Sequence, residues 1–370
     1  MARVLFWSEH FWPYIGGAEV FAAGLLPKLR DRDHEFLVVT SHAELELPDE
    51  DDFEGIPVRR LPIRAALAAG DVRALMRALQ QVVRLKQSFA PDLVHANGIG
   101  PSLLLHLRSR PDATPWLLGV QQQLLDSQAA EASSLLRACL RSASWIAACS
   151  EAAAKQLRSL ELGVAARSST IFNGVEPPRS TPAPLPARPT VVYAGRLVPA
   201  KGVDVLLSAI ARLVPAIPGL GLAIAGDGPL RSSLETRARE LGIASLVDFR
   251  GWVEPEALPD TLNEATVVAM PSRQEGLPLV AVQASMMARP IVASRVGGLP
   301  EVVIDGETGW LIEPDDVDGL ARALTEALED PQEAARRGRQ ARRRALREFT
   351  LRRSVQDFDR LYEKLTRRNA

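Results

Sequence analysis

Two basic side chains follow a short apolar segment in the second half of the chain. Arg196 and Lys201 lie five residues apart, after the apolar residues 190–194 and before the helical pattern of residues 203–214. The apolar segment predicts a buried strand, so both cations would lie where a loop leaves the strand and enters a helix. Arg offers a planar fork of donors and Lys a compact charge, which together suit a diphosphate. Two solvated surface cations are the alternative interpretation.

An acidic residue and two backbone donors precede a second helical pattern, residues 278–288, which begins with proline as helices often do. The amides of Gly276 and Leu277 would point out of this helix N-terminus, a natural anion site. Glu275 cannot hold that anion, because like charges repel, and is better suited to accept hydrogen bonds from sugar hydroxyls. The amide of Gln283, within the helix, suits a ribose diol, although an ordinary polar helix residue is the alternative.

Glycines follow several of the predicted strands. They are Gly195, the pair Gly226 and Gly228, the pair Gly297 and Gly298 before Glu301, and the pair Gly16 and Gly17 before Glu19. Glycine permits a ligand to approach the backbone closely. One such loop could be simple turn chemistry, but four at strand-to-helix junctions favour a ligand site.

The elements that must position these residues alternate between strand and helix. Strands are predicted at 4–7, 36–40, 93–95, 116–120 and 145–148, and again at 190–194, 222–225, 247–249, 267–270 and 291–293. This alternation predicts an α/β fold of two Rossmann-like, doubly wound parallel-sheet domains that face a cleft. In such folds ligands bind beyond the carboxyl ends of the strands.

A proline-rich segment predicts the domain boundary. Six of the thirteen residues 177–189 are proline, so this segment cannot join a helix or a sheet and is predicted to be a stiff linker. The domains would be residues 1–176 and 190–350, with a terminal helix within 351–370. Residues 44–54 hold seven acids and are predicted to form a solvated loop rather than a metal site, because nothing orients the carboxylates.

Composition excludes several classes of protein. Of the 370 residues, 46% are hydrophobic and 24% charged, which is typical of a globular protein. A net charge of −1 gives no general attraction to nucleic acid. Two cysteines suit a reducing compartment. The sequence starts without a signal-peptide pattern and lacks a stretch of ~18 apolar residues that could span a membrane. We therefore expect a cytoplasmic protein.

As a set, the motifs resemble the family-four retaining glycosyltransferases of the GT-B fold, from about residue 3 to residue 365. The motifs are Gly16-Gly17-x-Glu19, Asn173-Gly174-Val175, Gly195-Arg196-Leu197 with Lys201, Gly226-x-Gly228-Pro229, Glu275-Gly276 and Gly297-Gly298-x-Pro300-Glu301. The resemblance implies that the second domain binds a UDP-, GDP- or ADP-linked sugar and that the first domain binds the acceptor. It also implies a terminal helix, residues 351–365, that crosses back onto the first domain.

The resemblance assigns roles to individual residues. Arg196 and Lys201 would hold the donor diphosphate, and Glu275 would bind the transferred sugar. The other donor-binding residues would be Gly16, Gly17, Gly195, Gly226, Gly228, Gly276, Leu277, Gln283 and Glu301. The acceptor-side residues would be Glu19, His95 and Asn97.

Some positions depart from the family pattern. A second Glu usually holds the ribose where this chain has Gln283, and a neutral amide binds hydroxyls more weakly. Asn97 and the run Gln121–Gln123 replace histidines that the family often has. These changes affect acceptor chemistry more than donor binding. His95 could equally be a buried core histidine.

The resulting hypothesis is sugar transfer with retention at the anomeric carbon, without a metal ion or other cofactor, to a glycan, a lipid-linked sugar or a small metabolite. Fixed cations and helix amides would stabilise the leaving diphosphate. A nucleotide-sugar epimerase and an inactive donor-binding subunit are the alternatives. The stretch Arg64–Lys86 could form a basic amphipathic helix that rests on anionic lipid at the inner face of the membrane, although packing on its own sheet is favoured.

Overall fold

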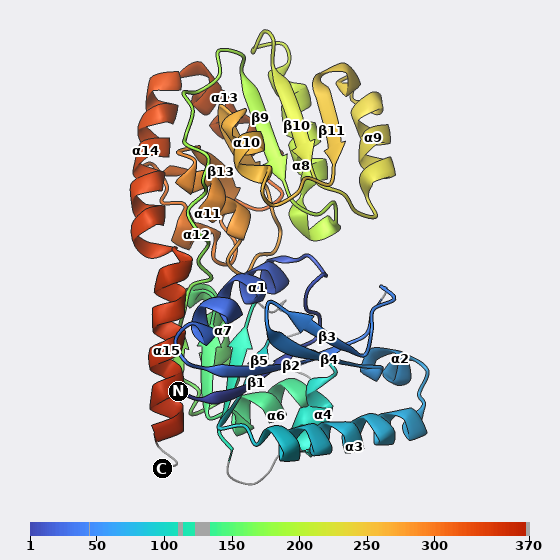
Figure 1. Cartoon of the computed structure of the whole chain (residues 1–370). Helices are drawn as coiled ribbons and strands as arrows, with labels where there is room; N and C mark the ends of the chain where they lie inside the picture. Colours follow the sequence, from blue (N-terminus) through green and yellow to red (C-terminus); the bar gives the residue numbers. More distant parts are fainter. Residues whose placement is uncertain (44, 110–113, 123–133, 368–370) are drawn as a thin grey trace. The chain divides into compact units, whose positions relative to one another are not determined.

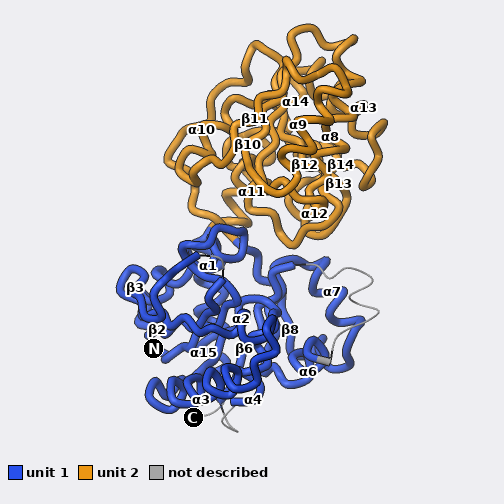
Figure 2. The backbone as a smooth tube through the Cα atoms, turned by 90° about the vertical axis from the view of Figure 1, so that its right-hand side faces the viewer, with its two compact units in different colours: residues 1–173, 351–370 blue, residues 174–350 orange. Residues whose placement is uncertain are grey.

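The described chain folds into two compact units. The computed structural model describes residues 1–43, 45–109, 114–122 and 134–367. One unit consists of residues 1–173 and 351–370, and the other of residues 174–350 (Figure 2). Each is built on its own largely parallel sheet (Figure 1). The prediction of two α/β parallel-sheet domains is confirmed.

The sheet of the first unit has the order β3-β4-β2-β1-β5-β6-β7-β8. Its strands are β1 (Arg3–Ser8), β2 (Glu35–Ser41), β3 (Glu50–Phe53), β4 (Ile56–Leu61), β5 (Leu93–Asn97), β6 (Trp116–Val120), β7 (Trp145–Ala148) and β8 (Ser168–Thr170). The order reverses beside β1, which pairs with β2 on one side and β5 on the other. The central strands are buried on both faces, as their continuous apolar runs predict.

Helices cover both faces of this sheet. They are α1 (Gly17–Arg30), α2 (Ile63–Ala68), α3 (Val72–Phe89), α4 (Leu103–Arg108), α6 (Ser134–Ser142), α7 (Glu151–Leu160) and α15 (Leu351–Arg367). α1 and α15 pack together on one face, and α3, α4 and α6 lie on the other (Figure 1). α15 buries Phe358, Leu361 and Tyr362 in this unit.

The second unit has the sheet order β11-β10-β9-β12-β13-β14, with every neighbouring pair parallel. The strands are β9 (Thr190–Ala194), β10 (Gly221–Ala225), β11 (Val247–Gly251), β12 (Val267–Met270), β13 (Ile291–Ser294) and β14 (Gly309–Ile312). The helices are α8 (Val203–Leu213), α9 (Arg231–Glu240), α10 (Leu258–Asn263), α11 (Leu279–Met286), α12 (Leu299–Val302), α13 (Val317–Glu329) and α14 (Pro331–Glu348). This is the doubly wound order in which ligands bind where the order reverses, here between β9 and β12.

Two predictions about the first unit need correction. Glu44 lies outside the described residues, and residues 50–53 form β3 rather than a loop. β3 pairs antiparallel with β4, where Asp51 accepts a hydrogen bond of 2.8 Å from the buried Arg60. The acids are tolerated because edge strands expose one side to water. The stretch 64–86 is not one helix, since α2 ends at Ala68 and the side chain of Asp71 caps α3.

The proline-rich segment 177–189 forms neither helix nor strand, as predicted, but it is anchored on the second unit. The side chain of Asn263 accepts a hydrogen bond of 3.0 Å from the Ala183 amide. The guanidinium of the fully buried Arg289 donates to the carbonyl of Ala183 and, at 3.0 Å, to Asn263. The segment is therefore part of the second unit rather than a free linker.

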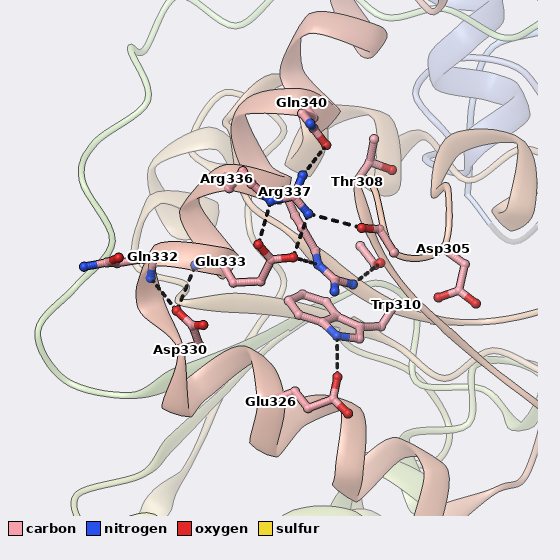
Figure 3. Close-up of polar contacts among 12 residues, drawn as sticks. Asp305, Thr308, Trp310, Glu326, Asp330, Gln332, Glu333, Arg336, Arg337 and Gln340 are labelled. Atoms are coloured by element: carbon pink, nitrogen blue, oxygen red, sulfur yellow. Dashed lines mark hydrogen bonds and ion pairs between the residues drawn. The ribbon is translucent and has the colours of Figure 1, made fainter.

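A polar cluster attaches α14 to the edge of the second sheet (Figure 3). Glu333 accepts hydrogen bonds of 2.6 Å from Arg336 and 2.7 Å from Arg337. Arg337 stacks 4.0 Å above the ring of Trp310 and donates to the carbonyl of Gly309 at 2.8 Å. The hydrogen bonds from Arg336 and Arg337 hold the pKa of Glu333 at about 2, below its ordinary 4.5.

The depressed pKa of Glu333 predicts a pH-dependent contribution to stability. The ionised carboxylate stabilises the folded state above about pH 4.5, and this contribution is lost as the pH falls toward 2. Glu333→Gln should lower the melting temperature at about pH 7, and the difference from the wild type should shrink toward about pH 3. Glu329→Gln, an exposed acid on α13, is the control and should show no such trend. A constant difference across this pH range would contradict the assignment.

Candidate functional site

Glycines allow the loops after neighbouring strands of the second unit to touch. A Cβ on Gly226, after β10, would lie 1.9 Å from the carbonyl oxygen of Gly195, after β9. A Cβ on Gly202 would lie 2.0 Å from the carbonyl oxygen of Pro271, after β12. Both glycines have positive φ, 148° and 65° respectively, which other residues rarely adopt. The loops after β10, β9 and β12 therefore form one continuous surface at the carboxyl end of the sheet.

The loop after β13 joins the same surface. The amide of Gly298 donates to the carbonyl of Gly276 at 2.8 Å, which ties the start of α12 to the loop before α11. Gly228 also packs closely, since a Cβ there would lie 2.6 Å from the carbonyl oxygen of Leu197. Three of the four glycine loops predicted from the sequence thus meet in one unit. The loop at Gly16 and Gly17 belongs to the other unit.

Lys201 and Glu275 form an ion pair within this surface. The Lys201 ammonium lies 2.6 Å from Oε1 of Glu275, and the hydroxyl of Ser272 donates to the same oxygen at 2.8 Å. The Glu275 side chain is 6% exposed, so its carboxylate is held rigidly, and Oε2 remains for another donor. An acidic residue and a basic one far apart in sequence thus lie at the point where the strand order reverses.

Arg196 lies in the segment between β9 and the turn that carries Lys201. Its side chain is exposed, and among the described residues no hydrogen bond or ion pair engages its guanidinium. The buried Tyr193 donates its hydroxyl proton to the carbonyl of Arg196 at 2.9 Å. Burial raises the pKa of Tyr193, the charge of Glu275 raises it further, and the charge of Arg196 lowers it. The charges of Glu275 and Arg196 therefore both act on the phenol of Tyr193.

Arg273 positions Lys201, a role that the sequence analysis missed. Its guanidinium donates to both carboxylate oxygens of Asp204 at 3.0 and 2.7 Å, to Asp315 at 2.7 Å and to the carbonyl of Pro199 at 2.7 Å. Although burial opposes the shift, the hydrogen bonds from Arg273 lower the pKa of Asp204. Pro199 begins the 3-10 turn that ends at Lys201, so Arg273 holds this turn. The sequence did contain one indication of this role, because Arg273 lies only two residues before Glu275.

The remaining predicted donor-side residues lie on α11 and α12. Gly276 and Leu277 precede Pro278, the N-cap of α11, so their amides are near that helix N-terminus. Gln283 lies in the second turn of α11 with a partly exposed side chain. Glu301 lies on α12, where Arg344 of α14 donates to its carbonyl at 2.8 Å.

The first unit has a pocket of about 180 Å³ at the corresponding end of its sheet. Its polar lining lies at the reversal of strand order and consists of Glu9 after β1, Glu19 in the first turn of α1, Asn97 at the end of β5, and Gln121 and Gln122 after β6. Gln121 donates to Asn97 at 2.6 Å, and Asn173 donates to Gln121 at 2.6 Å. Gln123, the last of the predicted glutamines, lies outside the described residues.

His95 is a core residue and does not line this pocket. It is 1% exposed, stacks on Phe358 and shares a hydrogen bond of 2.6 Å between Nδ1 and the hydroxyl of Tyr362. Burial lowers its pKa to about 3, so the ring is neutral. The acceptor-side assignment of His95 is therefore replaced by a structural one, in which it anchors α15.

A larger cavity, of about 640 Å³, lies among Arg30, His34, Ile56 and Phe89. This is the amino end of β2 and β4, whereas ligands of doubly wound sheets bind beyond the carboxyl ends. We assign it no role in the chemistry. Within the described part of the chain, no three His, Cys, Asp or Glu side chains gather as they would around a metal ion.

Comparison with known proteins agrees with this arrangement. Residues 181–344 match the family described as glycosyl transferases group 1, and residues 16–174 match the glycosyl transferase 4-like domain. A GDP-mannose-dependent alpha-(1-6)-phosphatidylinositol monomannoside mannosyltransferase of Mycolicibacterium smegmatis is 42% identical over 43% of this chain and 44% of its own length. A glycogen synthase of Mycobacterium tuberculosis is 39% identical over 46% of this chain and 40% of its own length. The matches thus span less than half the length of these relatives.

Solved structures resemble the chain over nearly its whole length. The sucrose-phosphate synthase of Thermosynechococcus elongatus aligns with a TM-score of 0.86 and 24% identity over 99% of both chains. Anabaena HepE, solved with UDP-glucose, aligns with a TM-score of 0.80 and 22% identity over 98% of this chain and 100% of its own. At this identity the likeness establishes the fold.

The contact between Gly226 and Gly195 predicts a local cost for any side chain at residue 226. Gly242 also has positive φ, 70°, but nothing lies within 4 Å of a Cβ there. Gly242→Ala should cost about 1 kcal/mol of unfolding free energy from backbone strain alone, and Gly226→Ala at least about 2 kcal/mol more. Urea unfolding of the two variants measures the difference. Equal losses would show that the loops do not need this close approach.

Proposed function

We propose that this chain, which belongs to the family-four glycosyltransferases of the GT-B fold, transfers a sugar from a nucleotide-sugar donor to an acceptor hydroxyl. The transfer retains the anomeric configuration and uses no metal ion. The ion pair of Lys201 and Glu275, at the carboxyl end of the second sheet, is the observation that carries the proposal. The names of the relatives, which include a GDP-mannose-dependent enzyme, and the HepE complex with UDP-glucose support a nucleotide-sugar donor.

The proposed mechanism is electrostatic. Breaking the bond between sugar and diphosphate develops negative charge on the leaving group. Lys201, held by Glu275, and the amides of Gly276 and Leu277 are in place before the reaction, so little reorganisation of these groups is needed as this charge appears, and the exposed Arg196 adds a second cation. Oε2 of Glu275 is available to accept a hydrogen bond from a sugar hydroxyl. Gln283 would bind the ribose through its neutral amide.

Two alternatives make different demands on the same residues. A nucleotide-sugar epimerase would convert the donor without an acceptor, and an inactive subunit would bind the nucleotide without turnover. The rigid pairing of Lys201 with a nearly buried carboxylate favours transfer, because a pure binding site does not need a preorganised acceptor of sugar hydroxyls. Incubating the donor alone identifies an epimerase by isomer formation, and donor hydrolysis or transfer to an acceptor excludes an inactive subunit.

We also propose that the acceptor side contacts anionic lipid through α3. Ala78, Val82 and Phe89 bury the inner face of this helix in the core of the first unit, as packing on the sheet requires. Its outer face exposes Arg73, Arg77 and Arg84, with Val72 and Met76 exposed by 68% and 51%. A basic face with exposed apolar side chains is typical of helices that lie on anionic membranes. The helices that the structure describes include none long and apolar enough to cross the bilayer.

The first prediction of this proposal concerns nucleotide binding and Lys201. One of UDP, GDP and ADP should raise the melting temperature. At a nucleotide concentration a hundredfold above Kd, binding should add about 2.7 kcal/mol to the free energy of unfolding. Lys201→Ala should fold normally, weaken this shift and lower kcat/KM by at least about a hundredfold, because it removes charge stabilisation of the leaving group. Lys155→Ala, an exposed lysine on α7, is the control. Near-normal kcat/KM in the Lys201 variant would refute the assignment.

The second prediction concerns lipid. Liposomes that contain phosphatidylserine should co-float with the protein, and liposomes of phosphatidylcholine alone should not. Replacing both Arg73 and Arg77 with Glu should abolish flotation, because each basic residue near the surface contributes about 1 kcal/mol. Replacing Arg237 and Arg239, on α9 of the other unit, is the matched control. Equal flotation with the two kinds of liposome would contradict the proposal.

A further inference from the structure

The pocket of the first unit contains a carboxylate that has no assigned role. Glu9 follows β1, and its Oε2 accepts a hydrogen bond of 3.2 Å from the amide of Ser102. Its Oε1 is buried and lacks a hydrogen-bond partner. A Cβ on Gly100 would lie 2.3 Å from Oε2, so the carboxylate lies directly against that glycine. The chain therefore accommodates this acid at a defined place.

Glu19, in the first turn of α1, lines the same pocket. A Cβ on Gly16 would lie 2.3 Å from Oε2 of Glu19, so its carboxylate folds back over that glycine. Neither Glu9 nor Glu19 forms an ion pair with a described residue, and the described lining contains neither Lys nor Arg. The pocket therefore holds two acids without a compensating charge.

The amides of the pocket leave these acids unsatisfied. Asn173 donates to Gln121, Gln121 donates to Asn97, and Asn97 reaches the carbonyl of Ala18 at 3.4 Å. These amide side chains therefore hydrogen-bond to one another and to the backbone rather than to Glu9 or Glu19. Asn97 and Asn173 are both buried. Gln121 and Gln122 keep amide N–H groups that can donate, whereas the two carboxylates of the lining only accept. A ligand that supplies donors therefore suits the carboxylates.

Resting on the function proposed above, we propose that this pocket binds an acceptor ring that carries a protonated amine, held by Glu9 and Glu19. A polyol would offer hydroxyl donors but would leave both negative charges uncompensated. An ammonium group offers three donors and the opposite charge, and such charge-assisted hydrogen bonds are about twice as strong as neutral ones. A metal ion is a poorer occupant, because the described residues provide no third ligand of the usual kind. Glu9 and Glu19 are thus specificity residues for an amino-sugar or amino-cyclitol acceptor.

D-glucosamine and D-glucose test this proposal, because they differ by an ammonium group in place of a hydroxyl. NMR titration without donor should give a Kd for glucosamine at least about tenfold lower than for glucose at neutral pH. Glu9→Gln should reduce this preference to less than about threefold while preserving the fold, and Glu19→Gln should reduce it in part. Glu363→Gln, an exposed acid on α15, changes the net charge equally and should leave the preference unchanged.

Several outcomes would overturn the proposal. They are equal affinity of the wild type for the two sugars, no measurable binding of glucosamine, and a preference that survives Glu9→Gln. If Glu9→Gln fails to fold, the wild-type comparison and Glu19→Gln still decide the matter. The nucleotide shift in melting temperature is measured on the same samples. A normal nucleotide shift without an amine preference overturns only the acceptor assignment, whereas loss of any nucleotide shift counts against the proposed transferase.

Discussion

The donor-side site depends on the close approach of backbones at the carboxyl end of the second sheet. Gly226 lies against the carbonyl of Gly195, and Gly202 lies against the carbonyl of Pro271. These contacts exclude any side chain, so the loops after three adjacent strands are held at fixed separations. The ion pair between Lys201 and Glu275 can be 2.6 Å long only because the turn and the loop that carry them are fixed in this way.

The two sheets differ in strand number, but both reverse their strand order beside the first strand of the unit. The polar groups at these two places differ in charge. In the second unit the group includes Arg196 and Lys201, which suit a diphosphate. In the first unit it includes Glu9 and Glu19 without a described cation, which suits a donor-rich or cationic ligand. One architecture thus provides two kinds of binding chemistry.

Sequence reasoning succeeded where local pattern decides structure and failed where distant segments meet. The strands at 116–120, 145–148 and 190–194 were predicted to the residue, because buried parallel strands are short apolar runs between turns. The acidic residues 50–53 were mistaken for a loop, since no apolar pattern marks an exposed edge strand. The role of Arg273 was missed because Asp204 and Asp315, its partners, are 69 and 42 residues away.

The sequence by itself determined the fold class, the alternation of strands and helices, and the residues that could hold a diphosphate. These follow from hydrophobic periodicity and from glycines and charges at predicted junctions, which are local properties. Only the tertiary structure decided which of those residues meet. It placed His95 under Phe358 and Tyr362 in the core, paired Lys201 with Glu275, and left Oε1 of Glu9 without a hydrogen-bond partner. Burial and pairing depend on groups brought together from distant parts of the chain, which no local pattern encodes.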